Sequence, residues 1–345
     1  MRARPPAPGA RGFRHEAFFY VDDDGYASAV AAFLRAGLEA DEPVMAVLPA
    51  PRLEMVRQAL NGSSEHVLMA DMADVGRNPA RIIPEWRRFV DASSGGPMRG
   101  VGEPLWVGRG RQEGIECHRH EWLLSRAFAA DPLLWLVCPY DASGLDAADL
   151  AVARRLHPGV FDPADVVRPV AGPAAGPEPA ALGPDPTAAP LWAEPFPVDD
   201  SLPSAPDEVP VDLRFGNGDL AEVRDATGSA AIAAGLEAYR AKELTLAVHE
   251  VASNVVRHTG GTGRLRVWTA TAGIEGPAAV VCEIADNGRA AGPIADPMVG
   301  RERPSTGLDS GRGLWLANQL CDLVQLRTSG SGTVVRMHAL LPVPA

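Results

Sequence analysis

The chain has 345 residues, 46% hydrophobic and 22% charged, which is the composition of a soluble globular protein with room for about two domains. Its 32 Lys and Arg residues against 44 Asp and Glu residues give a net charge of −12, which disfavours direct binding to nucleic acid or to an anionic membrane. We expect a cytoplasmic protein, because no apolar run approaches the ~20 residues that span a bilayer, no secretory signal is visible and the four cysteines form no CxxC pair.

The first part of the chain, residues 12–157, alternates strand-like and helix-like runs. Apolar strand candidates lie at 17–21, 44–48, 66–69, 100–106 and 133–138. Runs with helical spacing lie between and after them, at 26–40, 53–60, 82–90, 116–128 and 147–156. Apolar strands between amphipathic helices are typical of a parallel sheet covered on both faces. The predicted fold class of this part is therefore α/β, with a doubly wound parallel sheet.

A proline-rich stretch follows. Fourteen of the 32 prolines fall between Pro158 and Pro210, and residues 170–186 are mostly alanine, glycine and proline. Such a stretch has too few large apolar side chains to offset the entropy of ordering. We predict a semi-extended linker over residues 158–206.

The second part, residues 207–343, has a different pattern. A short strand at 211–215 precedes two helices, at 220–239 and 242–258. Strand candidates follow at 265–270, 278–285, 323–327 and 333–341, and a Gly/Pro-rich loop at 287–312 leads into a helix at 313–321. Helices gathered ahead of an antiparallel meander indicate an α+β sandwich.

The second of these helices carries a polar pair. Glu250 and Asn254 are four residues apart and share one face. Leu246, Val251 and Val255 belong to the apolar stripe, which places the pair at the border of the core. A carboxylate and an amide oxygen suit a hard cation such as Mg²⁺, which takes few protein ligands and binds substrate phosphates as well.

Asp286 ends an apolar strand and is followed by Asn287 and Gly288. This order leaves a carboxylate facing a cavity beside exposed backbone. A buried carboxylate needs hydrogen-bond donors, and an adenine amino group is one such donor.

A third group opens the last helix. Gly311 and Gly313, on either side of Arg312 and ahead of Leu314, permit close approach of backbone, and free N–H groups at a helix N-terminus form an anion site. Thr333 then opens the final strand. Each pattern by itself is more often a solvated helix face, a turn or a helix cap. Their order along the chain favours a shared site.

That order resembles the GHKL ATP-binding fold, also called the Bergerat fold, found in histidine kinases and gyrase. The resemblance covers residues 207–343. It implies that ATP and Mg²⁺ are bound, with Asn254 as the Mg²⁺ ligand, Asp286 on the adenine amino group and residues 288–310 as a lid. It further assigns to the ATP site the residues Gly288, Gly311, Arg312, Gly313, Leu314 and Thr333.

Within this superfamily, the short loop after Arg257 and the run from Gly311 to Asn318 are most similar to the anti-sigma-factor serine/threonine kinases. The resemblance implies that Glu250 is the general base that takes the proton of a seryl or threonyl hydroxyl during phosphoryl transfer. It implies a sigma factor, a STAS-type anti-sigma antagonist, or both, as partners, and a homodimer.

Two alternatives stay open. In the first, ATP binding only sets the shape of the lid and of a partner surface, without catalysis. In the second, the chain is an unorthodox sensor histidine kinase. A two-helix hairpin with a phosphoacceptor histidine is not visible in the sequence, and His157, at a domain edge, lacks that context.

Residues 12–157 resemble the MEDS sensory domain, named for methanogens, methylotrophs and a dichloromethane-responsive regulator. The resemblance rests on the segments 15–20, 33–44, 102–106, 120–121 and 138–141. It implies a RecA-like α/β fold that senses a small-molecule ligand. A Gly-x-x-x-x-Gly-Lys-Ser/Thr loop is missing, which argues against a P-loop ATPase.

Ligands of open α/β sheets bind beyond the carboxyl ends of the strands. The candidate sensory residues there are Tyr20, Asp22, Glu103, Trp106 and Asp141. His15 is a further candidate, although a residue ahead of the first strand more often bonds a neighbouring carbonyl. Cys117, His118 and His120 suggest zinc, but only Cys117 and His120 share a helix face, so we expect no metal site in this part.

Overall fold

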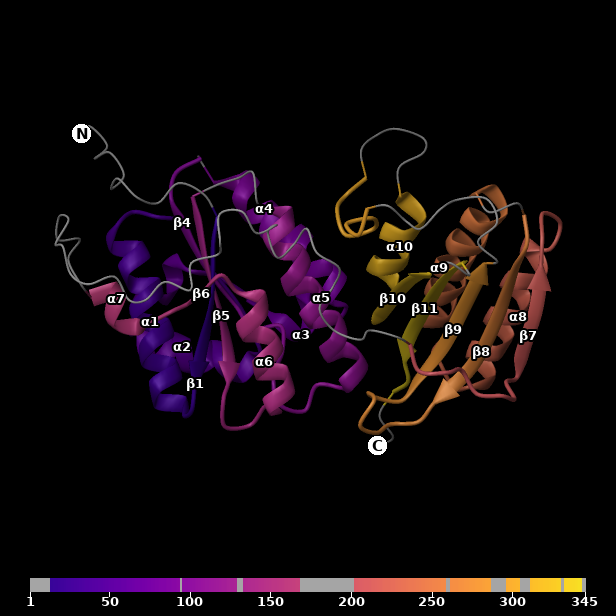
Figure 1. Ribbon diagram of the computed structural model, residues 1–345, viewed down its shortest axis with the longest axis horizontal. Helices are drawn as coiled ribbons and strands as arrows, with labels where there is room; N and C mark the ends of the chain where they lie inside the picture. Colours follow the sequence, from indigo (N-terminus) through magenta and orange to yellow (C-terminus); the bar gives the residue numbers. More distant parts are fainter. Residues whose placement is uncertain are drawn as a thin grey trace. The chain divides into compact units, whose positions relative to one another are not determined.

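The structure is a computed structural model that describes residues 13–93, 95–128, 133–167, 202–258, 261–286, 296–304, 311–329 and 332–342. The chain divides into two compact units, one built on a six-stranded sheet and the other on a five-stranded sheet (Figure 1). Within the described residues, no helix combines the length and the apolar character needed to cross a bilayer.

The sheet of the N-terminal unit is parallel, with strand order β3-β2-β4-β5-β1-β6. Its strands are β1 (Arg14–Tyr20), β2 (Val44–Leu48), β3 (Leu68–Asp71), β4 (Met98–Gly102), β5 (Leu134–Asp141) and β6 (Gly159–Val160). All five residues of β2 are buried. Both faces of this strand are therefore covered, which is why it has no polar alternation in the sequence.

Helices cover both faces of this sheet (Figure 1). On one face lie α1 (Asp23–Glu39), α2 (Ala50–Leu60) and α7 (Pro163–Val167); on the other lie α4 (Ile82–Ala92), α5 (Arg111–Ala127) and α6 (Ala147–Leu156). Shorter elements are η1 (Ser63–His66), α3 (Met72–Val75) and η2 (Pro79–Arg81). A Cβ atom at Gly100 would lie 2.6 Å from the Trp86 ring, so α4 packs directly onto β4. The predicted doubly wound α/β class is confirmed.

Two elements fall inside the range predicted as linker. In β6, Gly159 and Val160 pair with Glu16 and Ala17 of β1, and α7 follows. Phe161 between them is 3% exposed and lies in the core on the α1 face. Phe161 thus anchors the start of the range that the proline content predicted to be a linker. Residues 168–201, the greater part of the predicted linker, lie outside the described residues.

The sheet of the C-terminal unit is antiparallel, in the order β10-β11-β9-β8-β7. Its strands are β7 (Val211–Phe215), β8 (Gly263–Ala270), β9 (Ala279–Asp286), β10 (Leu323–Ser329) and β11 (Gly332–Leu340). Three helices cover one face: α8 (Leu220–Ala233), α9 (Ala238–His258) and α10 (Arg312–Leu320) (Figure 1). The predicted α+β sandwich is confirmed.

The helix α9 has the expected buried stripe, with one exception. Leu244, Val248, Val251 and Val255 are buried against the sheet, whereas Leu246 is 43% exposed. The first predicted helix ends early, at Ala233, because the chain turns through Gly235 at a left-handed φ of 92°.

The other face of this sheet holds a buried ionic group. Glu283 of β9 is 4% exposed and alternates with the core residues Cys282 and Ile284. Its carboxylate accepts hydrogen bonds from Arg266 (Nε to Oε1, 3.1 Å) and from Arg336 (Nη2 to Oε2, 2.5 Å). One carboxylate therefore compensates two guanidinium groups on neighbouring strands.

Candidate functional site

The polar pair predicted on the second helix lies on α9 of the C-terminal unit. Glu250 and Asn254 are one turn apart on α9, and both are half-buried. The neighbouring Val251 and Val255 are buried in the core. The pair therefore lies at the edge of the helix–sheet interface, on a rigid element, with part of each side chain open to solvent.

The start of α10 lies against this pair. A Cβ atom at Gly313 would lie 2.6 Å from Asn254 Nδ2 and 3.3 Å from both Cβ and the backbone oxygen of Glu250. Such separations leave no room for a side chain. A glycine is needed at position 313 because the start of α10 lies too close to Glu250 and Asn254 of α9 for a side chain to fit.

Gly311 shapes the entry into α10. It is the N-cap residue, with a left-handed φ of 57°, and its carbonyl accepts a hydrogen bond from the N–H of Trp315 at 3.0 Å. A glycine N-cap brings no side chain to satisfy the N–H groups of the first turn, which belong to Arg312, Gly313 and Leu314. The N–H groups at a helix N-terminus, together with the helix dipole, can bind an anion such as a phosphate.

The adenine end of the predicted site is formed by two strands. Asp286 is the last residue of β9, and Thr333 is the second residue of β11, the neighbouring strand. The backbone N–H of Thr333 donates to Asp286 Oδ1 at 2.9 Å. The carboxylate is half-buried. Gly288 lies outside the described residues.

Part of the predicted lid is described, residues 296–304. Asn318 of α10 donates from Nδ2 to the carbonyl of Gly300 at 2.8 Å. Gly300 has a left-handed φ of 76°, and a Cβ atom there would lie 2.7 Å from Leu314. This described part of the lid is therefore fastened along α10.

These residues fit a magnesium nucleotide. An acid and an amide stand beside a helix N-terminus that only glycine could build, and a carboxylate stands at the neighbouring strand ends. Of the predicted nucleotide residues that are described, the structure brings Glu250, Asn254 and Gly313 into contact, and Asp286 and Thr333 into a second contact.

Three candidate sensory residues meet in the N-terminal unit. Tyr20, Glu103 and Asp141 lie at or just beyond the carboxyl ends of β1, β4 and β5, which are adjacent in the sheet. The Tyr20 hydroxyl donates to Glu103 Oε1 at 2.9 Å, and Tyr26 donates to Oε2 at 2.9 Å. Tyr26 of α1 was not among the predicted sensory residues, since the sequence marked it only as the start of a predicted helix at 26–40.

Glu103 is an unusual acid. It is 1% exposed, and burial raises its pKa from 4.5 to about 7. The hydrogen bonds from Tyr26 and Tyr20 and the charge of Arg52 lower the pKa in part, whereas the charge of Asp141 raises it. The Arg52 guanidinium lies 4.6 Å from the centre of the Tyr26 ring. A buried acid that titrates near neutral pH is common in binding and catalytic sites.

The other sensory candidates do not belong to this group. Asp22 caps α1, accepting a hydrogen bond from the N–H of Gly25 at 2.7 Å, and Trp106 is half-buried in the segment after β4. His15 was expected ahead of the first strand, bonded to a carbonyl. It lies instead within β1, because the strand starts at Arg14, and it contacts side chains of Ser125, Cys138 and Glu121. Burial, and then the charge of His157, lower its pKa to about 4.

Comparison with known families agrees with these two units. Residues 14–158 match the model of the methanogen/methylotroph, DcmR sensory domain (MEDS). Residues 216–339 match the model of the histidine kinase-like ATPase domain. None of the curated proteins matches the chain.

Proposed function

We propose that this chain, which carries an N-terminal MEDS domain and a C-terminal histidine kinase-like ATPase domain, couples a small-molecule sensor to an ATP-dependent serine/threonine kinase of the anti-sigma type. The sensor would span residues 12–157 and the kinase residues 207–343. The kinase would bind a sigma factor, phosphorylate a STAS-type anti-sigma antagonist, or both.

The observation that carries this proposal is the contact of Gly313 with Glu250 and Asn254. It joins two motifs that are about sixty residues apart in the sequence, and it brings a carboxylate and an amide beside the N-terminus of α10. The Glu250 carboxylate is half-buried at the edge of the α9–sheet interface, so packing of the core does not explain it.

Bound Mg-ATP would supply the transferable phosphoryl group and the cation that neutralises its charge. The side-chain oxygen of Asn254 would ligate Mg²⁺, and the first-turn N–H groups of α10 would hold phosphate oxygens. The Asp286 carboxylate, which already accepts from the backbone N–H of Thr333, would also accept from the adenine amino group. The Glu250 carboxylate would accept the proton from the partner's hydroxyl.

His157 is poorly placed to accept a phosphoryl group, which favours a hydroxyl acceptor on a partner. The side chain of His157 is 1% exposed, and its Nδ1–H donates to the carbonyl of Ala153 at 2.8 Å. An attacking imidazole needs a free, accessible nitrogen.

The test is phosphoryl transfer by the full chain from radiolabelled Mg-ATP to candidate antagonist proteins. For Glu250→Gln we expect transfer to slow by about 10²-fold or more, because a positioned general base contributes at least that much. Its Mg-ATP affinity, measured by calorimetry, should stay within about threefold of wild type, a small change in binding free energy.

The matched control is Glu243→Gln, on the same helix. The Glu243 carboxylate forms an ion pair with Arg240 and is not part of the Glu250–Asn254 pair. It should leave transfer unchanged. Acid-labile phosphate on a histidine of the chain would contradict the hydroxyl assignment. A chain that binds Mg-ATP and a partner but transfers nothing would show a non-catalytic switch.

A further inference from the structure

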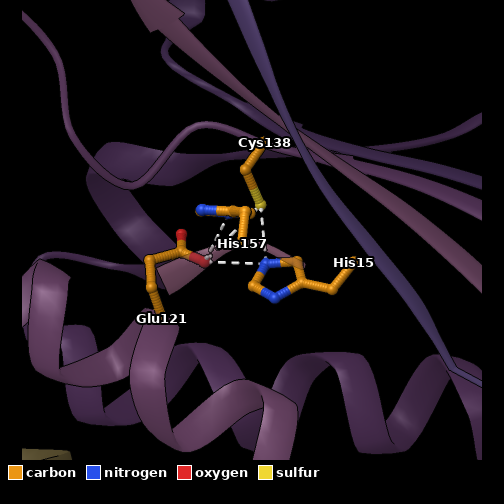
Figure 2. A group of neighbouring side chains, drawn as sticks. All are labelled: His15, Glu121, Cys138 and His157. Carbon is orange, nitrogen blue, oxygen red and sulfur yellow. Dashed lines mark hydrogen bonds and ion pairs between the residues drawn. The ribbon is translucent and has the colours of Figure 1, made fainter. Parts of the chain in front are cut away.

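Four side chains from separate segments converge in the interior of the N-terminal unit (Figure 2). They are His15 on β1, Glu121 on α5, Cys138 on β5 and His157 at the end of α6. One potential ligand atom from each lies within 4.8 Å of every other, and all four residues are buried. None of them belongs to the nucleotide site or to the group around Glu103.

The atoms that face one another are His15 Nε2, Glu121 Oε2, Cys138 Sγ and His157 Nε2. From Glu121 Oε2, the distance is 2.9 Å to His15 Nε2, 3.4 Å to His157 Nε2 and 3.6 Å to Cys138 Sγ. His15 Nε2 lies 3.3 Å from Cys138 Sγ. In a tetrahedral zinc site, with bonds of 2.0–2.3 Å, ligand atoms are separated by about 3.3–3.8 Å. The cluster is therefore already close to that spacing.

The outer nitrogen of each histidine has its own partner. The Nδ1–H of His157 donates to the carbonyl of Ala153 at 2.8 Å, and Nδ1 of His15 lies 3.1 Å from the hydroxyl of Ser125. Metal-binding histidines are usually held in this way, with the nitrogen away from the metal bonded to a carbonyl, a carboxylate or another polar group. Both rings consequently turn Nε2 toward the cluster.

His157 Nε2 faces Glu121 Oε2, and the two atoms satisfy each other only with a proton or a metal ion between them. A carbonyl can only accept, so Nδ1 of His157 carries a proton, and the neutral form of the ring presents a lone pair at Nε2. That lone pair points at a carboxylate oxygen 3.4 Å away. Among the described residues, His157 Nε2 and Glu121 Oε1 find no hydrogen-bond partner, although both are buried. Two electron-rich groups facing each other call for a cation between them.

We propose that His15, Glu121, Cys138 and His157 form a closed, four-ligand site for a divalent transition metal of the zinc type. Two neutral imidazoles, one carboxylate and one thiolate carry a charge of −2, which the ion neutralises. The donor set of nitrogen, oxygen and sulfur is one that zinc accepts and that the hard cations Mg²⁺ and Ca²⁺ do not favour. When the ion binds, the Cys138 S–H bond breaks, the S–metal bond forms, and the proton leaves to solvent.

All four positions of this shell are filled by the protein, and the side chains of His15, Glu121 and His157 are 1% exposed. Sites closed in this way are structural and hold elements together, whereas catalytic zinc sites keep an open position. The ion would join the adjacent strands β1 and β5 to the helices α5 and α6, which lie on one face of the sheet.

The first experiment uses the full chain, purified without chelators, with zinc measured by mass spectrometry and protein by absorbance. We expect about one zinc ion per chain. After removal of zinc, cobalt(II) should restore a tetrahedral visible spectrum and a thiolate-to-cobalt charge-transfer band in the near ultraviolet. Cobalt added to the wild-type chain without such a band would overturn the proposal, and the cluster would then be a hydrogen-bonded network only.

Variants locate the ion. Cys138→Ser should abolish the charge-transfer band, whereas Cys117→Ser should keep it. Cys117 is the matched control, because it is equally buried in the same part of the chain but its thiol donates to the carbonyl of Pro104 at 3.2 Å. A band that survives in Cys138→Ser would place the metal elsewhere and contradict the assignment.

Ser125→Ala provides a variant that leaves every ligand in place. Loss of the hydroxyl beside His15 Nδ1 should lower the affinity for zinc about 10- to 100-fold and preserve the cobalt charge-transfer band. A purely structural hydroxyl would leave the zinc affinity unchanged, and that result would remove its role as a positioning residue.

Discussion

Replacing Gly313 by alanine adds one methyl group at the contact between α9 and α10. The new Cβ would lie 2.6 Å from Asn254 Nδ2 and 3.3 Å from backbone and Cβ atoms of Glu250. The amide of Asn254 ends a short side chain and can rotate away, whereas the Glu250 backbone can yield only by a few tenths of an ångström. The substitution therefore displaces the residue that would ligate Mg²⁺.

Stability and nucleotide binding should respond differently. Alanine gains roughly 0.5–1 kcal/mol over glycine inside a helix, and crowding costs roughly 1–3 kcal/mol, so the unfolding free energy should fall by roughly 0–2.5 kcal/mol. The Mg-ATP affinity should fall at least about tenfold, or ~1.4 kcal/mol, because Asn254 no longer presents its amide. Urea unfolding and calorimetric titration measure the two quantities.

Gly228→Ala is the control. This glycine lies within α8, and a Cβ atom there would meet Thr245 Oγ1 at an ordinary 3.4 Å. It should stabilise the chain by roughly 0.5–1 kcal/mol and leave Mg-ATP binding unchanged. In an Asn254→Ala background, Gly313→Ala should cost little further affinity. If Gly313→Ala behaves like Gly228→Ala in both assays, the contact between the two motifs has no role in binding.

Two further predictions concern buried carboxylates. Because the Glu103 pKa is raised from 4.5 to about 7, the folded state holds its proton more tightly than the unfolded state, so the contribution of this group to stability is greatest below pH 4.5 and falls by about 3 kcal/mol as pH rises to 7. Glu103→Gln should lack this decline in pH-dependent urea unfolding, and an unchanged pH profile would disprove the assignment. Glu283→Gln should destabilise by about 3 kcal/mol, since it leaves Arg266 and Arg336 undercompensated, and an equal loss in Asp212→Asn, an exposed pair with Arg264, would show that burial is not the cause.

Much of the fold could be predicted from local patterns. The strand at Val44–Leu48 and the helix at Ala147–Leu156 have the predicted bounds, because hydrophobic periodicity and turn residues mark their ends. The sequence order of β1 and β5 does not show that they are neighbours, and Phe161 does not reveal that it anchors a sixth strand. Both depend on packing between distant segments.

The two sites show the same limit. The nucleotide residues form a recognisable series, because each lies on a motif with its own glycine or helix signal. The cluster of His15, Glu121, Cys138 and His157 has no such spacing, since one residue comes from each of four segments. Sequence reasoning weighed only the nearby Cys117, His118 and His120, and the parallel sheet instead brings together residues that are up to about 140 positions apart.

The most direct test of the account is a crystal structure of the full chain with Mg²⁺ and a non-hydrolysable ATP analogue. We expect phosphate density against the N–H groups of Arg312 and Gly313, Mg²⁺ on Asn254, and the adenine amino group on Asp286. Nucleotide bound at another place, or none at saturating concentration, would contradict the assignment of this unit as an ATP-dependent kinase.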